Sequence, residues 1–172
     1  MTKFKIRLIV IDADIARSSG ETEHPVSQCS RQCLEQIQKS SLIVAMCLEL
    51  QAEWRKHKSR YASLWYTTMV KRGRTRTISL THPLLNWDDV TIISQEQKPI
   101  AQKDEHLVRL ALSVNECHFI ASNDDKSRKI FATIHSEHIR KELAWFVPTK
   151  SIESEMQQLF GGHTDKPTSW HF

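Results

Sequence analysis

The sequence predicts an α/β fold, a three-layer α/β/α arrangement in which helices cover both faces of a central, mostly parallel sheet. Three observations support this prediction. Short apolar segments alternate with amphipathic ones along the 172 residues, as strands and helices do in this fold class. Residues 4–11 begin by alternating and end wholly apolar, which is typical of a central strand of a parallel sheet. No internal repeat or linker divides the chain, so we expect one domain with a sizeable core.

The expected elements follow one another in a regular order. Short apolar stretches predict strands at residues 4–11, 42–45, 118–122 and 143–147. Apolar residues at helical spacing predict helices at residues 28–39, 46–58, 61–71, 104–114 and 125–135. Between them we expect a polar loop at 17–27 and a largely irregular stretch at 74–101, with 90–93 as a candidate short strand. The main domain then covers residues 1–150, followed by a partly flexible extension at 151–172.

The composition argues against a membrane protein. Hydrophobic residues make up 40% of the chain, a normal share for a globular protein. The longest unbroken apolar run, Leu42–Leu48, is far shorter than the roughly 20 residues that a membrane helix needs. The first residues also lack the long apolar segment of a signal peptide. We therefore expect a cytoplasmic protein whose cysteines are reduced.

Two of the four cysteines have a spacing that admits two interpretations. Cys29, Cys33 and Ile37 lie on one face of the helix expected at 28–39. The two thiols could form half of a zinc site together with His24, or they could pack the helix against the core. No second pair at ligand spacing follows in the sequence, which favours packing.

A basic segment follows Glu53. Eight Lys or Arg residues occur from Arg55 to Arg76, and no acidic residue occurs between Glu53 and Asp88. Cations bind phosphate and aromatic side chains stack on bases, so single-stranded nucleic acid is a natural ligand. The aromatic residues have a second interpretation, because Tyr61, Trp65 and Met69 are spaced like the core face of a helix. The residues that we expect to contact the substrate backbone are Arg55, Lys71, Arg72, Arg74 and Arg76.

Acidic residues occur where parallel strands end. Asp12 and Asp14 follow the first strand, and Asp124 and Asp125 follow the strand at 118–122, while Asp104 begins the helix that precedes it. In open α/β sheets, ligands bind beyond the carboxyl ends of the strands. Crowded carboxylates raise one another's pKa, and a divalent cation with a preference for oxygen ligands, Mg²⁺ or Mn²⁺, relieves that repulsion.

Two of the acids have structural alternatives. Asp104 precedes Leu107 and Val108 by three and four residues, so it points toward the interior, although Asp is also a favoured helix N-cap. On the helix at 46–58, Glu53 lies roughly 75° from the centre of the apolar face and Glu49 about 115°. Glu53 therefore borders the buried side, unless it is a solvated ion-pair partner of Lys56 or His57.

Four short motifs occur in a recognisable order. They are Leu8-Ile-Val-Ile-Asp12-Ala-Asp14, Ile43-Val-Ala-Met-Cys-Leu-Glu-Leu-Gln-Ala-Glu53-Trp, Lys103-Asp104-Glu-His-Leu107 and Phe119-Ile-Ala-Ser122-Asn-Asp124-Asp125. Together they resemble the PIN domain, a family of metal-dependent nucleases with a Rossmann-like fold, over about residues 6–147. The chain departs from the family pattern at Ala13, where Thr is usual, and at Asp14, where Asn is usual.

The resemblance implies which side chains form the site. It implies an acidic catalytic centre of Asp12, Glu53, Asp104 and Asp124. Ser122 would orient a ligand or a water molecule, and Asp14 or Asp125 would share in binding Mg²⁺ or Mn²⁺. The expected activity is hydrolysis of phosphodiester bonds in single-stranded or structured RNA by an endoribonuclease.

Other interpretations remain open at this point. The chain could be a catalytically weak PIN-like module that binds RNA or protein, although all four acidic positions are filled. A receiver domain also clusters aspartates on a parallel sheet, but no phosphoacceptor Asp and later Lys are arranged as it requires. By analogy with small nucleases, we also expect a role as a toxin or defence-system effector, an antitoxin or defence-system protein as a partner, and a homodimer as an alternative assembly.

Overall fold

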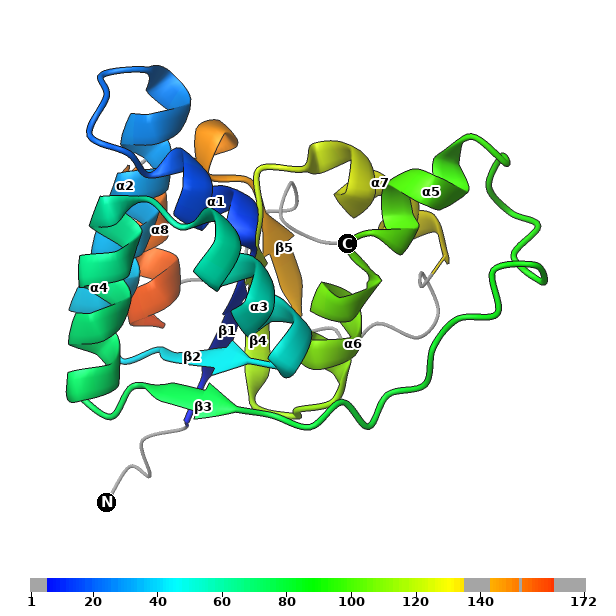
Figure 1. Cartoon of the computed structure of the whole chain (residues 1–172), viewed down its shortest axis with the longest axis horizontal. Coiled ribbons are helices and arrows are strands. Elements are labelled where there is room, and N and C mark those ends of the chain that lie inside the picture. Colours follow the sequence, from blue (N-terminus) through cyan, green and yellow to red (C-terminus); the bar gives the residue numbers. More distant parts are fainter. Residues whose placement is uncertain (1–5, 135–142, 152, 163–172) are drawn as a thin grey trace.

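Figure 1 shows the computed structural model of the chain, a three-layer α/β/α fold built on a five-stranded parallel sheet. The structure describes residues 6–134, 143–151 and 153–162. The strand order is β3-β2-β1-β4-β5, and each pair of neighbours is parallel. The strands are Leu8–Ile11 (β1), Ile43–Met46 (β2), Thr75–Thr77 (β3), Cys117–Ala121 (β4) and Ala144–Phe146 (β5). The predicted fold class is therefore confirmed, and the sheet is wholly parallel over these strands.

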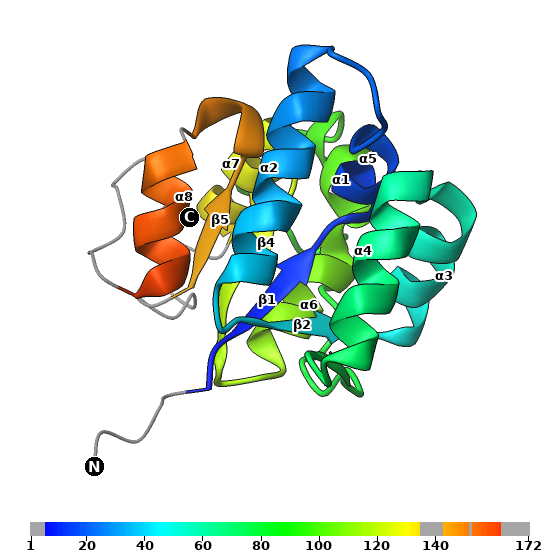
Figure 2. The same cartoon turned by 90° about the vertical axis from the view of Figure 1, so that its left-hand side faces the viewer.

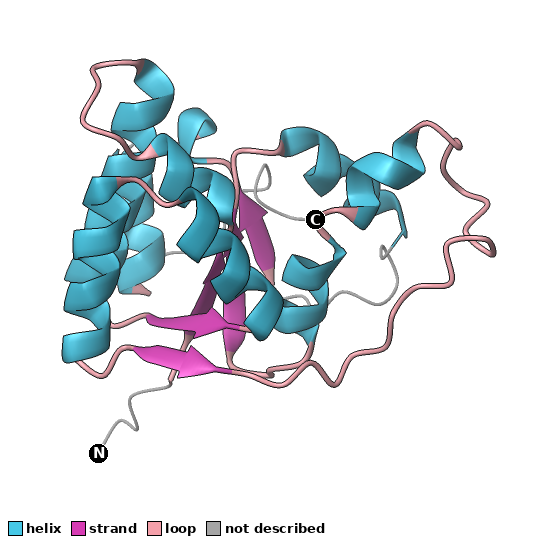
Figure 3. Ribbon diagram, viewed as in Figure 1, coloured by secondary structure: helices cyan, strands magenta, loops and turns pink. Residues whose placement is uncertain are grey.

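Helices cover both faces of the sheet. They are Ala13–Ser18 (α1), Pro25–Lys39 (α2), Leu48–His57 (α3), Arg60–Lys71 (α4), Gln97–Gln102 (α5), Glu105–Leu112 (α6), Asp125–Ile134 (α7) and Glu153–Gly161 (α8), with a 3₁₀ turn at Pro148–Lys150 (η1). Helices α2, α4 and α8 lie together on one side, and α5, α6 and α7 lie on the other (Figures 1 and 2). Figure 3 shows the strands enclosed between these layers. Within the described ranges, no helix is long and apolar enough to span a bilayer.

The central strands are buried because helices pack on both of their faces. All four residues of β1 are inaccessible to solvent, and all five residues of β4 are buried. Helix α6 presents Leu107, Val108 and Ala111 to the core. Burial on both faces explains why β1 is wholly apolar and why β4 is apolar apart from the buried His118.

Helices α2 and α4 meet through their apolar stripes. This packing decides between the two interpretations of the cysteine pair and between the two interpretations of the aromatic residues in the basic segment. Cys33 is fully buried beside Leu34, so it packs the helix against the core. Trp65 is buried as well, and its indole Nε1 donates a hydrogen bond to the Leu34 carbonyl at 2.7 Å. Met69 is fully buried on the same stripe of α4. The stripe is therefore a packing surface, and Trp65 is not a platform for stacking bases.

The structure also contains short elements that the sequence did not predict. Helix α1 follows β1 directly, and both β3 and α5 lie in the stretch that was expected to be irregular. No strand forms at 90–93, where the Val90 N–H bonds to the Trp87 carbonyl in a turn. The described part of the C-terminal extension contains a helix that the sequence did not predict. Helix α8 packs on α2 and buries Phe160 completely, while residues 163–172 lie outside the described residues.

Candidate functional site

A polar pocket opens at the carboxyl ends of β1 and β4. Its volume is about 240 Å³. The side chains that line it are Asp12, Ala13, Asp14, Arg17, Glu53, His57, Lys103, Asp104 and Asp124. Five of the predicted acids, carried by four separate segments of the chain, therefore border one cavity. Parallel strands place their carboxyl ends at the same edge, which brings these distant segments together.

The residues after β1 and β4 are joined by a network around one hydroxyl. Ser122 donates from Oγ to Asp12 Oδ2 at 2.7 Å and is 3.2 Å from Asp14 Oδ2. Asp14 Oδ2 also accepts a hydrogen bond from the Asn123 N–H at 3.0 Å. Asp12 is the N-cap of α1 and accepts from the Asp14 N–H. Ser122 therefore holds the two acids in place and does not itself line the pocket.

Burial shifts the pKa values of these acids. Asp12 is only 6% exposed, and burial raises its pKa even though the Ser122 hydroxyl stabilises the carboxylate. The pKa of Asp14 rises well above its usual range, first because of burial and then because of the neighbouring Asp12 charge. The second oxygen of Asp14, Oδ1, is buried with no hydrogen-bond partner among the described residues. A buried carboxylate oxygen without a donor is an electrostatic cost, which a bound cation would relieve.

Asp104 does not act as a helix cap. It lies at the N-cap position of α6, but its side chain makes no capping hydrogen bond. Instead, Asp104 Oδ2 accepts a hydrogen bond from Ser127 Oγ at 2.5 Å and contacts the Lys103 ammonium at 3.0 Å. Burial raises the pKa of Asp104, although the Ser127 hydroxyl opposes the shift. The capping alternative is thus excluded, and the carboxylate lies at the wall of the pocket.

Lys103 joins two acids from different segments. Its Nζ is 3.0 Å from Asp104 Oδ2 and 2.6 Å from Asp124 Oδ2. Burial alone would raise the pKa of Asp124, but the hydrogen bonds from Lys103 and from backbone N–H groups, together with the Lys103 charge, outweigh it and lower that pKa. The pKa of Lys103 rises because these two contacts outweigh its own burial. The ammonium therefore stays charged and neutralises part of the acidic cluster.

The side chain of Glu53 is more exposed than those of Asp104 and Asp124, which line the same pocket. Its side chain is 43% exposed, and Oε2 lies 3.2 Å from His106 Nε2. The Glu53 carboxylate therefore lies close to His106 on α6 without forming a hydrogen bond to Nε2. Glu53 also lines the pocket, as its predicted place beside the buried face of α3 implied.

The acids fit a divalent cation by chemistry, but they do not converge on one point. Carboxylate oxygens are the ligands that Mg²⁺ and Mn²⁺ prefer, and the unpartnered Asp14 Oδ1 lies among them. In the described part of the chain, however, no three His, Cys, Asp or Glu side chains lie together closely enough to hold a metal ion. Lys103 and the two serine hydroxyls occupy several of the oxygens that such an ion would use.

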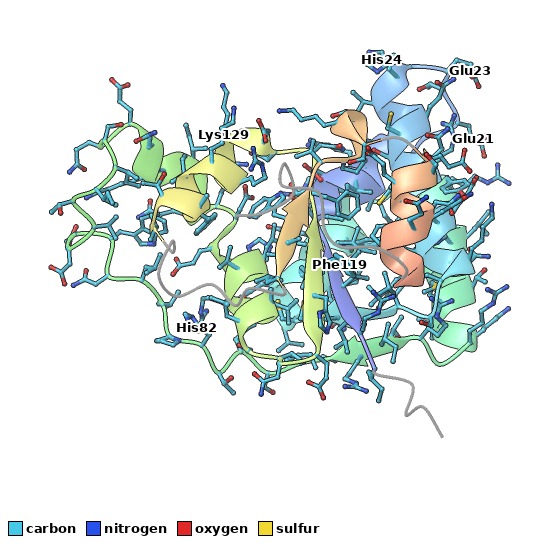
Figure 4. All side chains as sticks on the ribbon, turned by 180° about the vertical axis from the view of Figure 1, so that it is seen from behind. Glu21, Glu23, His24, His82, Phe119 and Lys129 are labelled. Atoms are coloured by element: carbon cyan, nitrogen blue, oxygen red, sulfur yellow. The ribbon has the colours of Figure 1, made fainter. Side chains whose placement is uncertain are left out.

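Asp125 lies outside the pocket, contrary to its predicted role as a metal ligand. It pairs with Arg128 at 2.7 Å, with Lys129 at 3.2 Å and with Lys150 at 2.6 Å. Although burial opposes the change, hydrogen bonds from these cations lower the pKa of Asp125 far below its usual value. Lys129 lies on the outer surface of α7 in Figure 4. Asp125 is therefore part of a surface ion-pair network.

Most of the predicted phosphate-binding residues lie away from the acids. Arg74 donates from its guanidinium to the carbonyls of Ile37, Gln38 and Leu42, between 2.6 and 3.0 Å. It is thus a structural link between the end of α2 and β2. Lys71 and Arg72 precede β3, so they lie at the edge where the strands begin, opposite the pocket.

Two further cations have different positions. Arg76 lies within β3, opposite Ala45, and does not line the pocket. Arg55 lines a separate cavity of about 150 Å³ on the far side of α3, together with Lys58, Trp54 and Tyr66. The prediction that Arg74 contacts the substrate backbone is therefore wrong, because its donors already bind carbonyl groups of the chain. Arg55 lies on α3, the helix that also carries Glu53.

Sequence reasoning missed three residues that line the pocket, Lys103, Arg17 and His57, and also His106, which lies beside Glu53. Lys103 precedes Asp104, and His106 follows it by two positions, so both belong to a motif that was recognised for its acid alone. Arg17 and His57 line the pocket because α1 and the end of α3 lie side by side. For Lys103 and His106, the signal available in the sequence was their position beside Asp104, an acid that was already recognised.

No protein-family model and no curated protein matches the chain.

Proposed function

We propose that this protein is a metal-dependent endoribonuclease that hydrolyses phosphodiester bonds, with a PIN-like catalytic centre. One observation carries the proposal. Five carboxylates from four segments, those of Asp12, Asp14, Glu53, Asp104 and Asp124, border a single open cavity at the carboxyl ends of the parallel strands. Such crowding destabilises the fold through charge repulsion. A bound metal ion would offset this repulsion, and metal-assisted hydrolysis would give the cluster a function.

The chemistry divides between a cation and the chain. Asp12, Asp14, Asp104 and Asp124 would hold Mg²⁺ or Mn²⁺, which lowers the pKa of a bound water and stabilises charge on a phosphate. Ser122 keeps Asp12 oriented through its 2.7 Å hydrogen bond. Glu53 is accessible to solvent at the rim, so its Oε2 can accept a proton from the attacking water and pass it to bulk solvent.

The RNA substrate would meet positive charge beside the acids. Arg17 and His57 line the same pocket as the carboxylates. Arg55 and Lys58 flank the neighbouring cavity at the end of α3. Cations at these places can hold phosphates on either side of the cleavage point, and such contacts position the backbone without reading its sequence.

A second candidate function has its own support. The ion pairs between Lys103 and two of the acids neutralise the cluster without a metal. A PIN-like module that binds RNA or protein but cleaves weakly would need such neutralisation. The two candidates differ in one measurable property, which is the dependence of cleavage on divalent ions.

Cleavage of RNA with a matched pair of variants tests the proposal. Mixed single-stranded and structured RNAs are incubated with the protein in Mn²⁺, in Mg²⁺ and in EDTA. We expect cleavage that EDTA abolishes, loss of cleavage in Asp104→Asn, and retention in Asp125→Asn, which makes the same change outside the pocket. Cleavage that persists in EDTA would refute the metal mechanism. Binding of RNA without cleavage in any metal would favour the second candidate.

A further inference from the structure

Lys103 lies at the junction between α5 and α6, where it faces acids from two parts of the chain. Its ammonium contacts Asp104 on its own segment and Asp124, which follows β4. The two N–O distances, 3.0 Å and 2.6 Å, are those of charge-assisted hydrogen bonds. The ammonium therefore occupies a position between two carboxylates that line the pocket. A divalent cation at the same position would also be attracted by both carboxylates.

The Lys103 side chain is much more exposed than the carboxylate of Asp104 that it contacts. It is 55% exposed, whereas the side chain of Asp104 is 8% exposed. The four-carbon stem of lysine is flexible and carries a compact charge. The buried carboxylate is therefore fixed by the fold, whereas the lysine that neutralises it reaches the pocket from a side chain that is largely in contact with solvent.

On the other side of the pocket, where Arg17 also lines the cavity, the hydrogen-bond donors to the acids are uncharged groups. Asp12 and Asp14 accept hydrogen bonds from Ser122 and from the Asn123 N–H, which carry no charge. Asp14 Oδ1 is left buried without a partner among the described residues. The acidic cluster therefore has an ammonium in direct contact on the Asp104–Asp124 side, whereas neutral groups donate the hydrogen bonds on the Asp12–Asp14 side.

We infer that Lys103 is a tethered cation that competes with divalent metal ions for the Asp104–Asp124 side of the pocket. The lysine stabilises the metal-free protein and weakens its affinity for metal, because an ion that uses these oxygens must displace the ammonium. This inference rests on the proposed function for its biological sense, but it concerns cation binding and can be tested without RNA.

Calorimetric titration of Mn²⁺ into the whole chain tests the competition. Lys103→Met keeps the length of the side chain and removes its charge. We expect its Mn²⁺ affinity to rise about tenfold, which corresponds to about 1.4 kcal/mol and is the size expected when two partly exposed ion pairs are lost. Lys103→Arg keeps the charge and should stay within about threefold of the wild type. Lys129→Met removes a lysine that pairs with Asp125 outside the pocket, and should change nothing.

Thermal unfolding gives a second, independent measurement. In EDTA, Lys103→Met should melt below the wild type, because the two carboxylates lose their counter-ion. Saturating Mn²⁺ should raise its midpoint by more than it raises the wild-type midpoint. Opposite effects on metal-free stability and on metal affinity mark competition, since a merely structural lysine would lower both. If Lys103→Met is poorly folded, Lys103→Gln serves for the same pair of measurements.

The outcomes separate this inference from the proposed nuclease activity. Unchanged or weaker Mn²⁺ affinity in Lys103→Met overturns the inference, even if the wild type cleaves RNA in a metal-dependent way. Tighter binding in the variant supports it, even if neither protein cleaves RNA. If neither protein binds Mn²⁺ at millimolar concentration, the inference is overturned together with the metal mechanism.

Discussion

Replacing Asp14 by Asn tests whether the acids of the pocket repel one another in the metal-free fold. The Ser122 hydroxyl is 2.7 Å from Asp12 Oδ2 and 3.2 Å from Asp14 Oδ2. The two carboxylate oxygens therefore lie within about 6 Å of each other, where unit charges repel by about 3 kcal/mol at an effective dielectric constant of about 20. Removing one charge while keeping the side-chain shape should raise the free energy of unfolding by about 1–3 kcal/mol.

The size of this stabilisation depends on pH. Burial, followed by the charge of Asp12, raises the pKa of Asp14 well above its ordinary value. Because the folded pKa exceeds the unfolded one, folding favours the protonated group, and wild-type stability falls as pH rises from the unfolded pKa through the folded pKa. Asparagine does not ionise. The gain from Asp14→Asn should therefore be largest at alkaline pH and should shrink toward about pH 4.

Urea denaturation in EDTA at several pH values measures both effects. Asp125→Asn is the matched control, because this acid has surface cations as partners and a lowered pKa. The control should lose up to about 1 kcal/mol at neutral pH, and that loss should disappear as pH falls toward the folded pKa of Asp125. A loss of more than about 1 kcal/mol in Asp14→Asn at alkaline pH would refute the reasoning. The ionised group would then be a structural anchor for the Asn123 N–H.

Two predictions concern the basic residues. Arg74→Gln should lower the free energy of unfolding by about 2–3 kcal/mol, because the buried carbonyls that it serves lose a charged donor. Urea denaturation measures this, and a loss as small as that of the exposed control Arg72→Gln would contradict it. Replacing Arg55 and Lys58 together by Gln should make the slope of log RNA affinity against log salt shallower by about 1.4, measured in Ca²⁺ to suppress cleavage. An unchanged slope, matching that of a Lys71→Gln and Arg72→Gln control, would place the substrate path elsewhere.

The parts of the site that follow buried strands could be predicted from the sequence. Asp12 and Asp124 come just after apolar segments that must be central strands, and parallel strands end at one edge. Their meeting therefore follows from topology alone. Asp104 was predictable for a related reason, since its spacing from Leu107 turns it toward the core. In each case the hydrophobic pattern of an element fixes the direction of its polar neighbour.

The roles of isolated charges could not be predicted in the same way. Arg74 and Asp125 look like site residues in the sequence, because both carry the expected charge in the expected region. The carbonyl partners of Arg74 near the end of α2 and one partner of Asp125, Lys150, are distant in the sequence, although Asp125 also pairs with Arg128 and Lys129 on its own helix. Strand β3 was missed for a similar reason. It has three polar residues, and its only strong determinant is the pairing with β2 that the rest of the fold provides.

The same contacts that preserve the pocket without metal also set how strongly it can bind one. Hydroxyl donors on Asp12 and Asp104, and the ammonium of Lys103, reduce a repulsion that would otherwise open the cluster. A contact that must be displaced when a cation uses the same oxygens would weaken metal affinity by the stabilisation that is lost, whereas a contact that is shared with the cation would weaken it less. The hydroxyls can rotate and remain in place beside a metal. A lysine cannot share its position with a divalent ion, and Lys103 is therefore the residue at which stability and metal binding are most directly opposed.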